Sequence, residues 1–70
     1  MQIYFNDTSM ECSDSESFVA ALSRYCQLAA LDLDSVAVAA GNQVVPRSQW
    51  SQIEVATHSR YAVFSAVAGG

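Results

Sequence analysis

The sequence predicts an α+β domain in which one helix covers one face of a mixed sheet of four to five strands. Apolar and polar residues alternate near the start of the chain, short apolar runs bounded by turn residues occur in the middle and near the end, and a single segment has helical periodicity. Seventy residues suffice for one domain only. With a single helix, only one face of the sheet can be covered, which is the α+β arrangement of a small domain.

The first element predicted is a β-hairpin over residues 2–12. Ile3 and Phe5 alternate with polar neighbours, which indicates a strand with these two side chains facing inward. Residues 6–9 are short polar side chains typical of a turn. Residues 10–12 then predict a second short strand.

The helix is predicted to begin within residues 13–17, a dense run of helix-capping residues. Ser13 and Glu16 could form a capping box, or Ser17 could cap the helix one turn later. Apolar residues then recur at helical spacing, namely Phe18, Leu22 and Tyr25, with Val19 and Cys26 beside them. Residues 32–35 close the helical segment.

The second half of the chain predicts three further strands. Their order is a strand over residues 36–40, a turn at residues 41–42, a short strand over residues 43–45, a single helical turn over residues 48–50 and a last strand over residues 61–67. Residues 1–67 would form the domain, and residues 68–70 a flexible tail. The long helical connection allows a later strand to return parallel to the first.

The composition fits a folded domain and excludes several classes of partner. Apolar residues make up 51% and charged residues 14% of the chain, unlike a disordered protein. The net charge is −4, and three arginines without a lysine cannot form a basic stripe, so we expect no nucleic-acid partner. Neither a membrane-spanning run nor a secretory signal is visible, and we expect a cytoplasmic protein without membrane contact.

Side chains that could perform catalysis or bind a metal are few. His58, the only histidine, stands in a polar segment and is expected to be a solvated loop residue. Cys12 and Cys26 fall on a strand and on the apolar helix face, where we expect small buried hydrophobic residues rather than nucleophiles. Asp32 and Asp34 are expected to be solvated. The sequence therefore predicts neither an enzyme nor a bound cofactor or metal.

Residues 46–50 combine a proline, an arginine and the only tryptophan. Pro46 ends the preceding strand because proline cannot donate to a ladder. Trp50 is expected to seal the core. Arg47 could serve either a partner or a local carboxylate.

The last three residues, Ala68, Gly69 and Gly70, form the second unusual feature. Glycine lacks a Cβ atom, so a strand that leads into glycines gives a thin tail. Such a tail can pass through a narrow channel and present its carboxylate inside another protein. The alternative is an ordinary frayed terminus.

Taken together, these segments resemble the sulfur-carrier proteins of thiamine biosynthesis, which are small ubiquitin-like β-grasp domains. The resemblance covers essentially the whole chain and is carried by residues 1–6, by residues 44–50 with their V-P-R-x-x-W pattern and by residues 66–70. The chain departs from the family's pattern at two turns. His58-Ser59 replaces the usual Gly-Asp, and Asn6-Asp7 replaces a frequent Asn-Gly.

The resemblance implies that Gly70 is the working residue. An E1-like adenylyltransferase would convert its carboxylate to an acyl-adenylate, and sulfur from a sulfur-donor enzyme would replace AMP to give a thiocarboxylate. Thiazole synthase would then take up this sulfur. ATP would be used by the adenylyltransferase, and the domain itself would bind no cofactor.

Partner binding is predicted on the sheet face that points away from the helix. Strand neighbours alternate between faces, so Tyr4 should point outward if Ile3 and Phe5 point inward. On the last strand we assign Phe64 to the outward face, beside Tyr4, because the first and last strands pair in β-grasp proteins. Together with the tail residues Ala68, Gly69 and Gly70, these aromatics would form the partner-binding site.

Two other functions remain open from the sequence alone. One is the small subunit of molybdopterin synthase, or a carrier in another thiocarboxylate pathway. The other is a ubiquitin-like binding module whose tail is inert.

Overall fold

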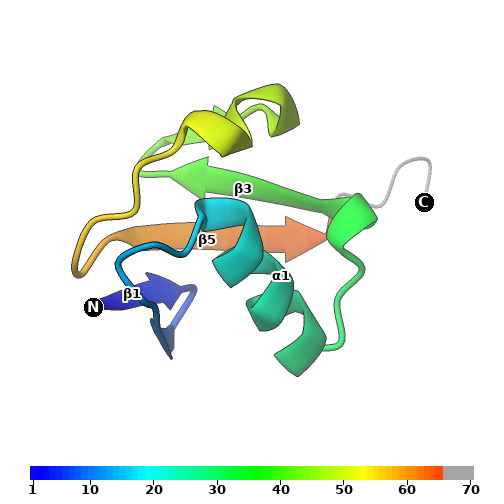
Figure 1. Cartoon of the computed structure of the whole chain (residues 1–70). Helices are drawn as coiled ribbons and strands as arrows, with labels where there is room; N and C mark the ends of the chain where they lie inside the picture. Colours follow the sequence, from blue (N-terminus) through cyan, green and yellow to red (C-terminus); the bar gives the residue numbers. More distant parts are fainter. Residues whose placement is uncertain (66–70) are drawn as a thin grey trace.

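The computed structural model describes residues 1–65, and the expectations for residues 66–70 lie outside these residues. Within the described part, the chain forms five strands, one α-helix and two short 3₁₀ helices (Figure 1). The elements are β1 (Gln2–Phe5), β2 (Thr8–Glu11), α1 (Phe18–Leu28), η1 (Leu33–Ser35), β3 (Val36–Ala40), β4 (Gln43–Val45), η2 (Arg47–Gln52) and β5 (Arg60–Ser65).

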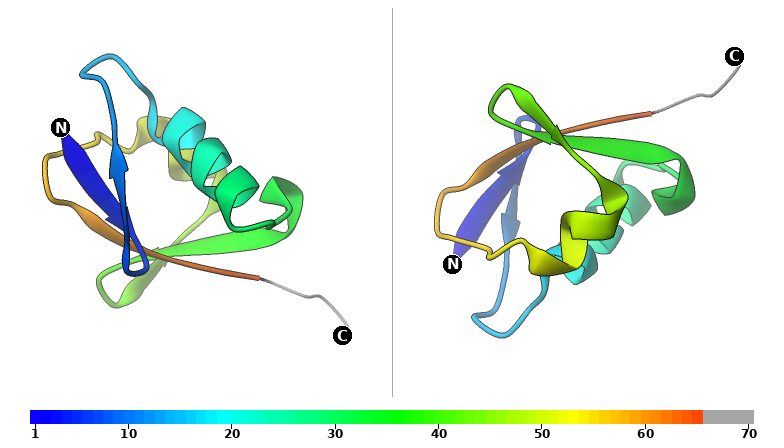
Figure 2. Two further views of the ribbon diagram at one scale, coloured as in Figure 1. Left: turned by 90° about the horizontal axis from the view of Figure 1, so that it is seen from below. Right: turned by 90° about the horizontal axis from the view of Figure 1, so that it is seen from above.

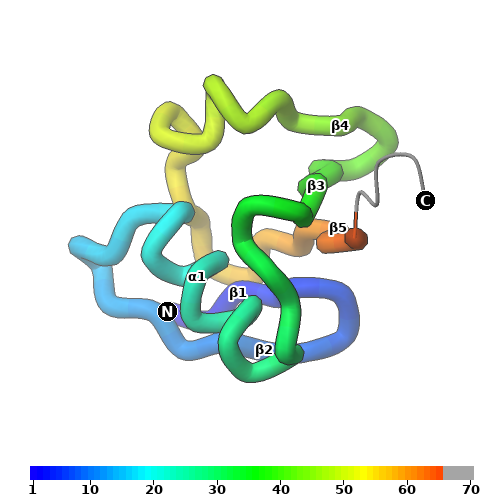
Figure 3. The backbone as a smooth tube through the Cα atoms, turned by 90° about the vertical axis from the view of Figure 1, so that its right-hand side faces the viewer, coloured from blue at the N-terminus to red at the C-terminus, as the bar shows by residue number. Residues whose placement is uncertain are grey.

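The strands form one mixed sheet in the order β2-β1-β5-β3-β4. β1 pairs antiparallel with β2 and parallel with β5, and β3 pairs antiparallel with both β4 and β5. The helix α1 packs across one face of this sheet and lies within its curve (Figures 2 and 3). The predicted α+β class, with a mixed sheet and one covering helix, is therefore confirmed.

The first hairpin has a tighter turn than the sequence predicts. Phe5 lies opposite Thr8, so only Asn6 and Asp7 form the turn, and β2 begins two residues earlier than expected. Asn6 has a φ of 56°. Asparagine tolerates this left-handed conformation, which permits a two-residue connection.

The N-terminus of α1 resolves the choice between the two capping arrangements. Ser17 is the N-cap, and its hydroxyl accepts a hydrogen bond from the amide of Ala20 at 3.1 Å. Glu16 instead accepts two hydrogen bonds from the guanidinium of Arg24, at 2.8 and 2.9 Å. These bonds hold the pKa of Glu16 below its usual value.

The C-terminus of α1 ends with a left-handed residue that is not glycine. Ala30 has a φ of 57°, and its amide donates to the carbonyl of Gln27 at 3.4 Å. The amide of Leu31 reaches the carbonyl of Cys26 at 2.8 Å. These two bonds form a Schellman motif, in which glycine is the preferred residue at the position of Ala30.

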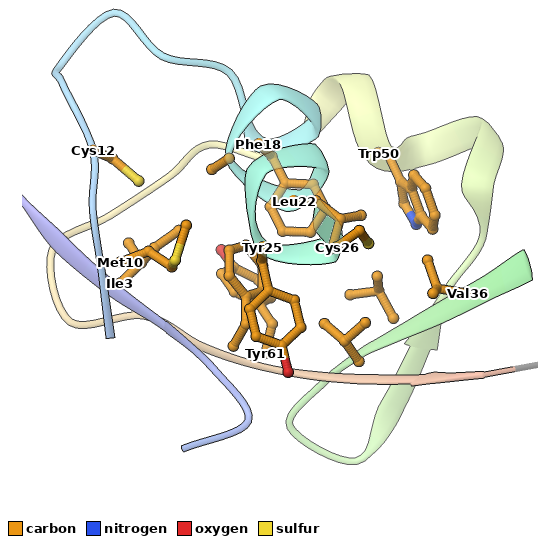
Figure 4. Close-up of a cluster of buried hydrophobic side chains, with 14 residues drawn as sticks. Ile3, Met10, Cys12, Phe18, Leu22, Tyr25, Cys26, Val36, Trp50 and Tyr61 are labelled. Carbon is orange, nitrogen blue, oxygen red and sulfur yellow. The ribbon is translucent and has the colours of Figure 1, made fainter. Parts of the chain in front are cut away.

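The core lies between α1 and the inner face of the sheet (Figure 4). Its largest side chains are aromatic, and the rings of Phe18 and Tyr61 meet edge to face with centroids 4.8 Å apart. Cys12 and Cys26 are free thiols, each with only 2% of its surface exposed. Burial raises the pKa of both. The prediction that they act as small buried hydrophobic residues is confirmed.

Residues 46–52 close the core at the β4 edge. η2 spans six residues, twice the length expected, and places Trp50 in the core with 3% of its surface exposed. The indole nitrogen of Trp50 donates to the carbonyl of Val45 at 3.0 Å. Arg47 stacks on this ring at 4.4 Å and donates to the carbonyls of Leu33 and Val36, at 3.0 and 3.3 Å. Arg47 thus joins η1 and β3 to η2, and it serves backbone carbonyls rather than a carboxylate.

Candidate functional site

The site expected from the sequence has two parts, and the structure describes one of them. Ala68, Gly69 and Gly70 lie outside residues 1–65. Tyr4 lies on β1 and Phe64 on β5, and β5 is the central strand of the sheet with β1 beside it.

The alternation predicted along β5 is confirmed by burial. Tyr61 and Val63 face α1 and are buried, whereas Ala62 and Phe64 are exposed on the opposite face. Phe64 has 45% of its surface exposed. A phenyl ring that is almost half exposed on an otherwise well-packed strand is available to a partner.

Tyr4 also faces away from α1, but it is not the neighbour of Phe64. The register places Tyr4 opposite Arg60, and the guanidinium of Arg60 lies 4.3 Å from the centre of the tyrosine ring. Phe64 is four residues further along β5, about 13 Å away at the usual strand rise. The expectation that the two aromatics lie side by side is therefore wrong, because the register of two parallel strands cannot be read from their alternation.

The neighbours of Phe64 come instead from β3 and β4. Ala37 lies opposite Phe64, and Ala39 lies between Ala62 and Val44. Val44 has 62% of its surface exposed. We call these five residues the outer patch, namely Ala37, Ala39, Val44, Ala62 and Phe64.

The contribution of β4 to this surface was not predicted from the sequence. A strand of three residues is too short to show which of its side chains face outward. Two adjacent valines, Val44 and Val45, indicate that one of them faces outward, because strand neighbours alternate. The pairing with β3 shows that Val44 is the outward residue.

One end of the outer patch meets a hollow of about 410 Å³. Its lining includes Ala39 and Ala62 from the patch, together with Asp7 and Arg60. The outer face therefore combines an apolar centre with charged side chains at its margin.

The remaining sequence candidates are not brought together. His58 is exposed in the turn before β5, and its φ of 68° explains why a glycine suits this turn. Among residues 1–65, no three histidine, cysteine, aspartate or glutamate side chains cluster closely enough to hold a metal ion. Within the same residues, no helix has the length and apolar character that crossing a membrane requires.

Comparison with known proteins identifies the family. No family model matches the chain. The chain is, however, 36% identical over 70 residues to the sulfur carrier protein ThiS of Escherichia coli (strain K12), and the match covers all of both chains. The chain belongs to the ThiS family of sulfur carriers. Membership in the ThiS family makes it a carrier rather than an enzyme, which accounts for the scattered reactive side chains of the described domain.

Proposed function

We propose that this ThiS-family chain carries sulfur on the carboxylate of Gly70 for formation of the thiazole ring of thiamine. The observation that carries the proposal is the full-length relationship to a sulfur carrier. The chain's own ending, Gly69-Gly70, supports it because glycines allow the terminal carboxylate to enter a narrow site. The molybdopterin and inert-module readings lack a comparable observation.

The chemistry requires a leaving group on a carboxylate that is otherwise a poor electrophile. A carboxylate oxygen of Gly70 attacks the α-phosphorus of ATP on an adenylyltransferase, and pyrophosphate leaves. The terminal sulfur of a persulfide on the donor enzyme attacks the acyl carbon, and AMP leaves. A thiol then cleaves the S–S bond to release the thiocarboxylate, which thiazole synthase uses as its sulfur source. The carrier domain supplies no catalytic group in these steps.

The outer patch is the surface by which partners would hold the domain. It is contiguous across β3, β4 and β5 and carries two large exposed apolar side chains, Phe64 and Val44. Exposed apolar surface of this kind marks interaction sites. The three residues between them are alanines, whose small side chains allow a partner to approach the sheet closely. Tyr4, under the guanidinium of Arg60, forms a separate polar margin.

The cytoplasm is the compartment that fits this function. Activation consumes ATP, and both cysteines of the chain are free thiols. Free thiols are usual where the surroundings are reducing. We therefore place the carrier and its partner enzymes in the cytoplasm.

The test is to incubate the chain with ATP, an adenylyltransferase of this pathway and a persulfide donor, and then to measure its intact mass. We expect a mass gain equal to the exchange of one oxygen for sulfur, located by fragmentation at Gly70. A variant that lacks Gly69 and Gly70 should gain no sulfur.

An unchanged mass in the presence of an enzyme that loads another carrier would contradict the proposal. Full biological activity of the shortened variant would do so as well, and it would favour a binding module with an inert tail.

A further inference from the structure

The last strand, β5, is paired over different lengths on its two edges. On one edge, β3 pairs with β5 from Ala62 to Ser65. On the other edge, β1 is in register only with Arg60 and Tyr61. Beyond Tyr61, β1 has already turned away at Asn6, whose φ is 56°.

The side chain of Asn6 continues the pairing where the backbone of β1 stops. Its Oδ1 atom accepts a hydrogen bond from the amide of Val63 at 3.0 Å, and its Nδ2 atom donates to the carbonyl of the same residue at 3.0 Å. The backbone amide of Asn6 also donates to the carbonyl of Tyr61 at 2.8 Å. The asparagine amide thus makes the two bonds that a neighbouring strand residue would make.

A second contact fixes the orientation of this amide. The Nδ2 atom of Asn6 also donates to the hydroxyl of Tyr25 at 3.0 Å. Tyr25 is buried on α1, with its ring 5.2 Å from that of Phe5. One side chain therefore ties β5 to the first hairpin and to the helix. Aspartate could not replace it, because a carboxylate cannot donate to the carbonyl of Val63.

These contacts are made two residues before the end of the described strand. Val63 is held by Asn6 on one edge and lies opposite Val38 on the other, and Ser65 lies opposite Val36. Ser65, two residues after Val63, is the last residue of β5, and the segment that ends in Gly70 follows it. The contacts of Asn6 therefore fix the course of the strand from which the terminal carboxylate is presented to a partner.

We propose that Asn6, oriented by Tyr25, is a positioning residue for the loading of Gly70. It holds the last strand in line so that a carrier docked by its outer patch presents its carboxylate at the reacting position. This inference rests on the proposed function, because it assumes that Gly70 is the group that is activated. It assigns docking and presentation to different residues, so the two can be separated kinetically.

The experiment compares Asn6→Gly with the unchanged chain. Glycine adopts the left-handed φ of residue 6 without cost and keeps the backbone bond to Tyr61, so only the amide is lost. Sulfur loading is followed by intact mass at several carrier concentrations, with an adenylyltransferase that loads the unchanged chain. We expect kcat to fall by about tenfold or more, because small misplacements of a reacting group are costly. KM should change little, and hydrogen exchange of the Val63 amide should accelerate.

A matched control separates positioning from general loss of stability. Ser17→Ala removes the N-cap of α1 and leaves the contacts of β5 in place. Its kcat should equal that of the unchanged chain at a temperature where both variants are folded. Equal kcat values for Asn6→Gly and the unchanged chain would overturn the proposal, as would equal losses in Asn6→Gly and Ser17→Ala.

A second variant covers the case in which Asn6→Gly does not fold. Tyr25→Phe removes only the hydroxyl that orients the amide, and it should lower kcat in the same direction with a smaller effect. An unchanged kcat in Tyr25→Phe would then count against the proposal. Failure of the unchanged chain to gain any sulfur would instead refute the proposed function and would not depend on Asn6.

Discussion

Phe64 is the residue on which the proposed docking surface depends most directly. It is the largest side chain of the outer patch and has 45% of its surface exposed. Aromatic residues carry a disproportionate share of binding energy at interfaces. Phe64→Arg should therefore leave the thermal unfolding midpoint nearly unchanged and raise KM for sulfur loading by about tenfold or more, the loss typical of an interface aromatic.

The chain offers a control for this substitution. Leu28 is 73% exposed at the end of α1, on the helical side of the molecule, and Leu28→Arg introduces the same charge away from the outer patch. It should be loaded with sulfur as fast as the unchanged chain. Equal loading of the Phe64 and Leu28 variants would show that partners do not use the outer patch.

Arg47 has a structural role that its motif does not reveal. The V-P-R-x-x-W segment contributes to the family resemblance, and its arginine could have served a partner. The guanidinium instead lies on Trp50 and donates to two backbone carbonyls of η1 and β3. Because the acceptors are main-chain atoms, no acidic residue in the sequence could have revealed them.

At the scale of elements, the C-terminus of α1 carries an avoidable strain. Ala30 adopts a φ of 57°, which costs an L-residue about 1 kcal/mol or somewhat more. Ala30→Gly removes this cost, although glycine also gains entropy in the unfolded chain. We expect a net gain in the free energy of unfolding of several tenths to about 1 kcal/mol, seen as a higher midpoint in urea.

The neighbouring residue provides the comparison. Ala29 has a φ of −92°, where an alanine is unstrained, so Ala29→Gly should lower the midpoint. Both positions are exposed, and neither substitution removes a core contact. A lower midpoint for Ala30→Gly, equal to that of Ala29→Gly, would mean that the left-handed conformation carries no net cost.

The elements themselves were largely predictable from the sequence, and their boundaries were less so. Helical spacing from Phe18 to Tyr25 and alternation at Ile3 and Phe5 result from burial, which has a fixed period in each element. The family resemblance placed the first turn at Asn6 and Asp7, but the run of polar residues did not show that the turn has only two residues, because this depends on one left-handed φ. The length of η2 depends on where Trp50 enters the core, which is a tertiary constraint.

Within the described part of the site, the sequence predicted which way the side chains of a single strand face, but not which residues of neighbouring strands lie beside them. Alternation correctly placed Phe64 on the outward face of β5. The partners of Phe64 across the sheet depend on register, and register depends on hydrogen bonds between distant segments. The register therefore places Val44 in the outer patch and Tyr4 outside it, unlike the surface expected from the sequence.

At the scale of the whole molecule, the two faces of the sheet have separate roles. The inner face and α1 bury the aromatic core, so stability depends on residues such as Phe5 and Phe18. The outer face leaves Phe64 and Val44 exposed, and the core does not need them. A carrier with this division can present a binding surface without weakening its fold, and the chemistry can be left to the terminal residues.

This division predicts that docking survives when the chemical group is removed. A chain that ends at residue 67 retains all five strands, α1 and the outer patch. It should fold with an unchanged unfolding midpoint. It should also compete with the full chain for the adenylyltransferase, raising the apparent KM for sulfur loading without changing kcat, while it gains no sulfur itself.

The same shortened chain with Phe64→Arg is the matched control. Both proteins lack Ala68, Gly69 and Gly70, so they differ only in the outer patch. If the patch provides the docking energy, the control should not compete at concentrations where the first chain inhibits. Equal inhibition by both would place the docking surface elsewhere on the domain. Inhibition by neither would mean that the tail itself supplies the affinity, so that docking and presentation could not be assigned to different parts of the molecule.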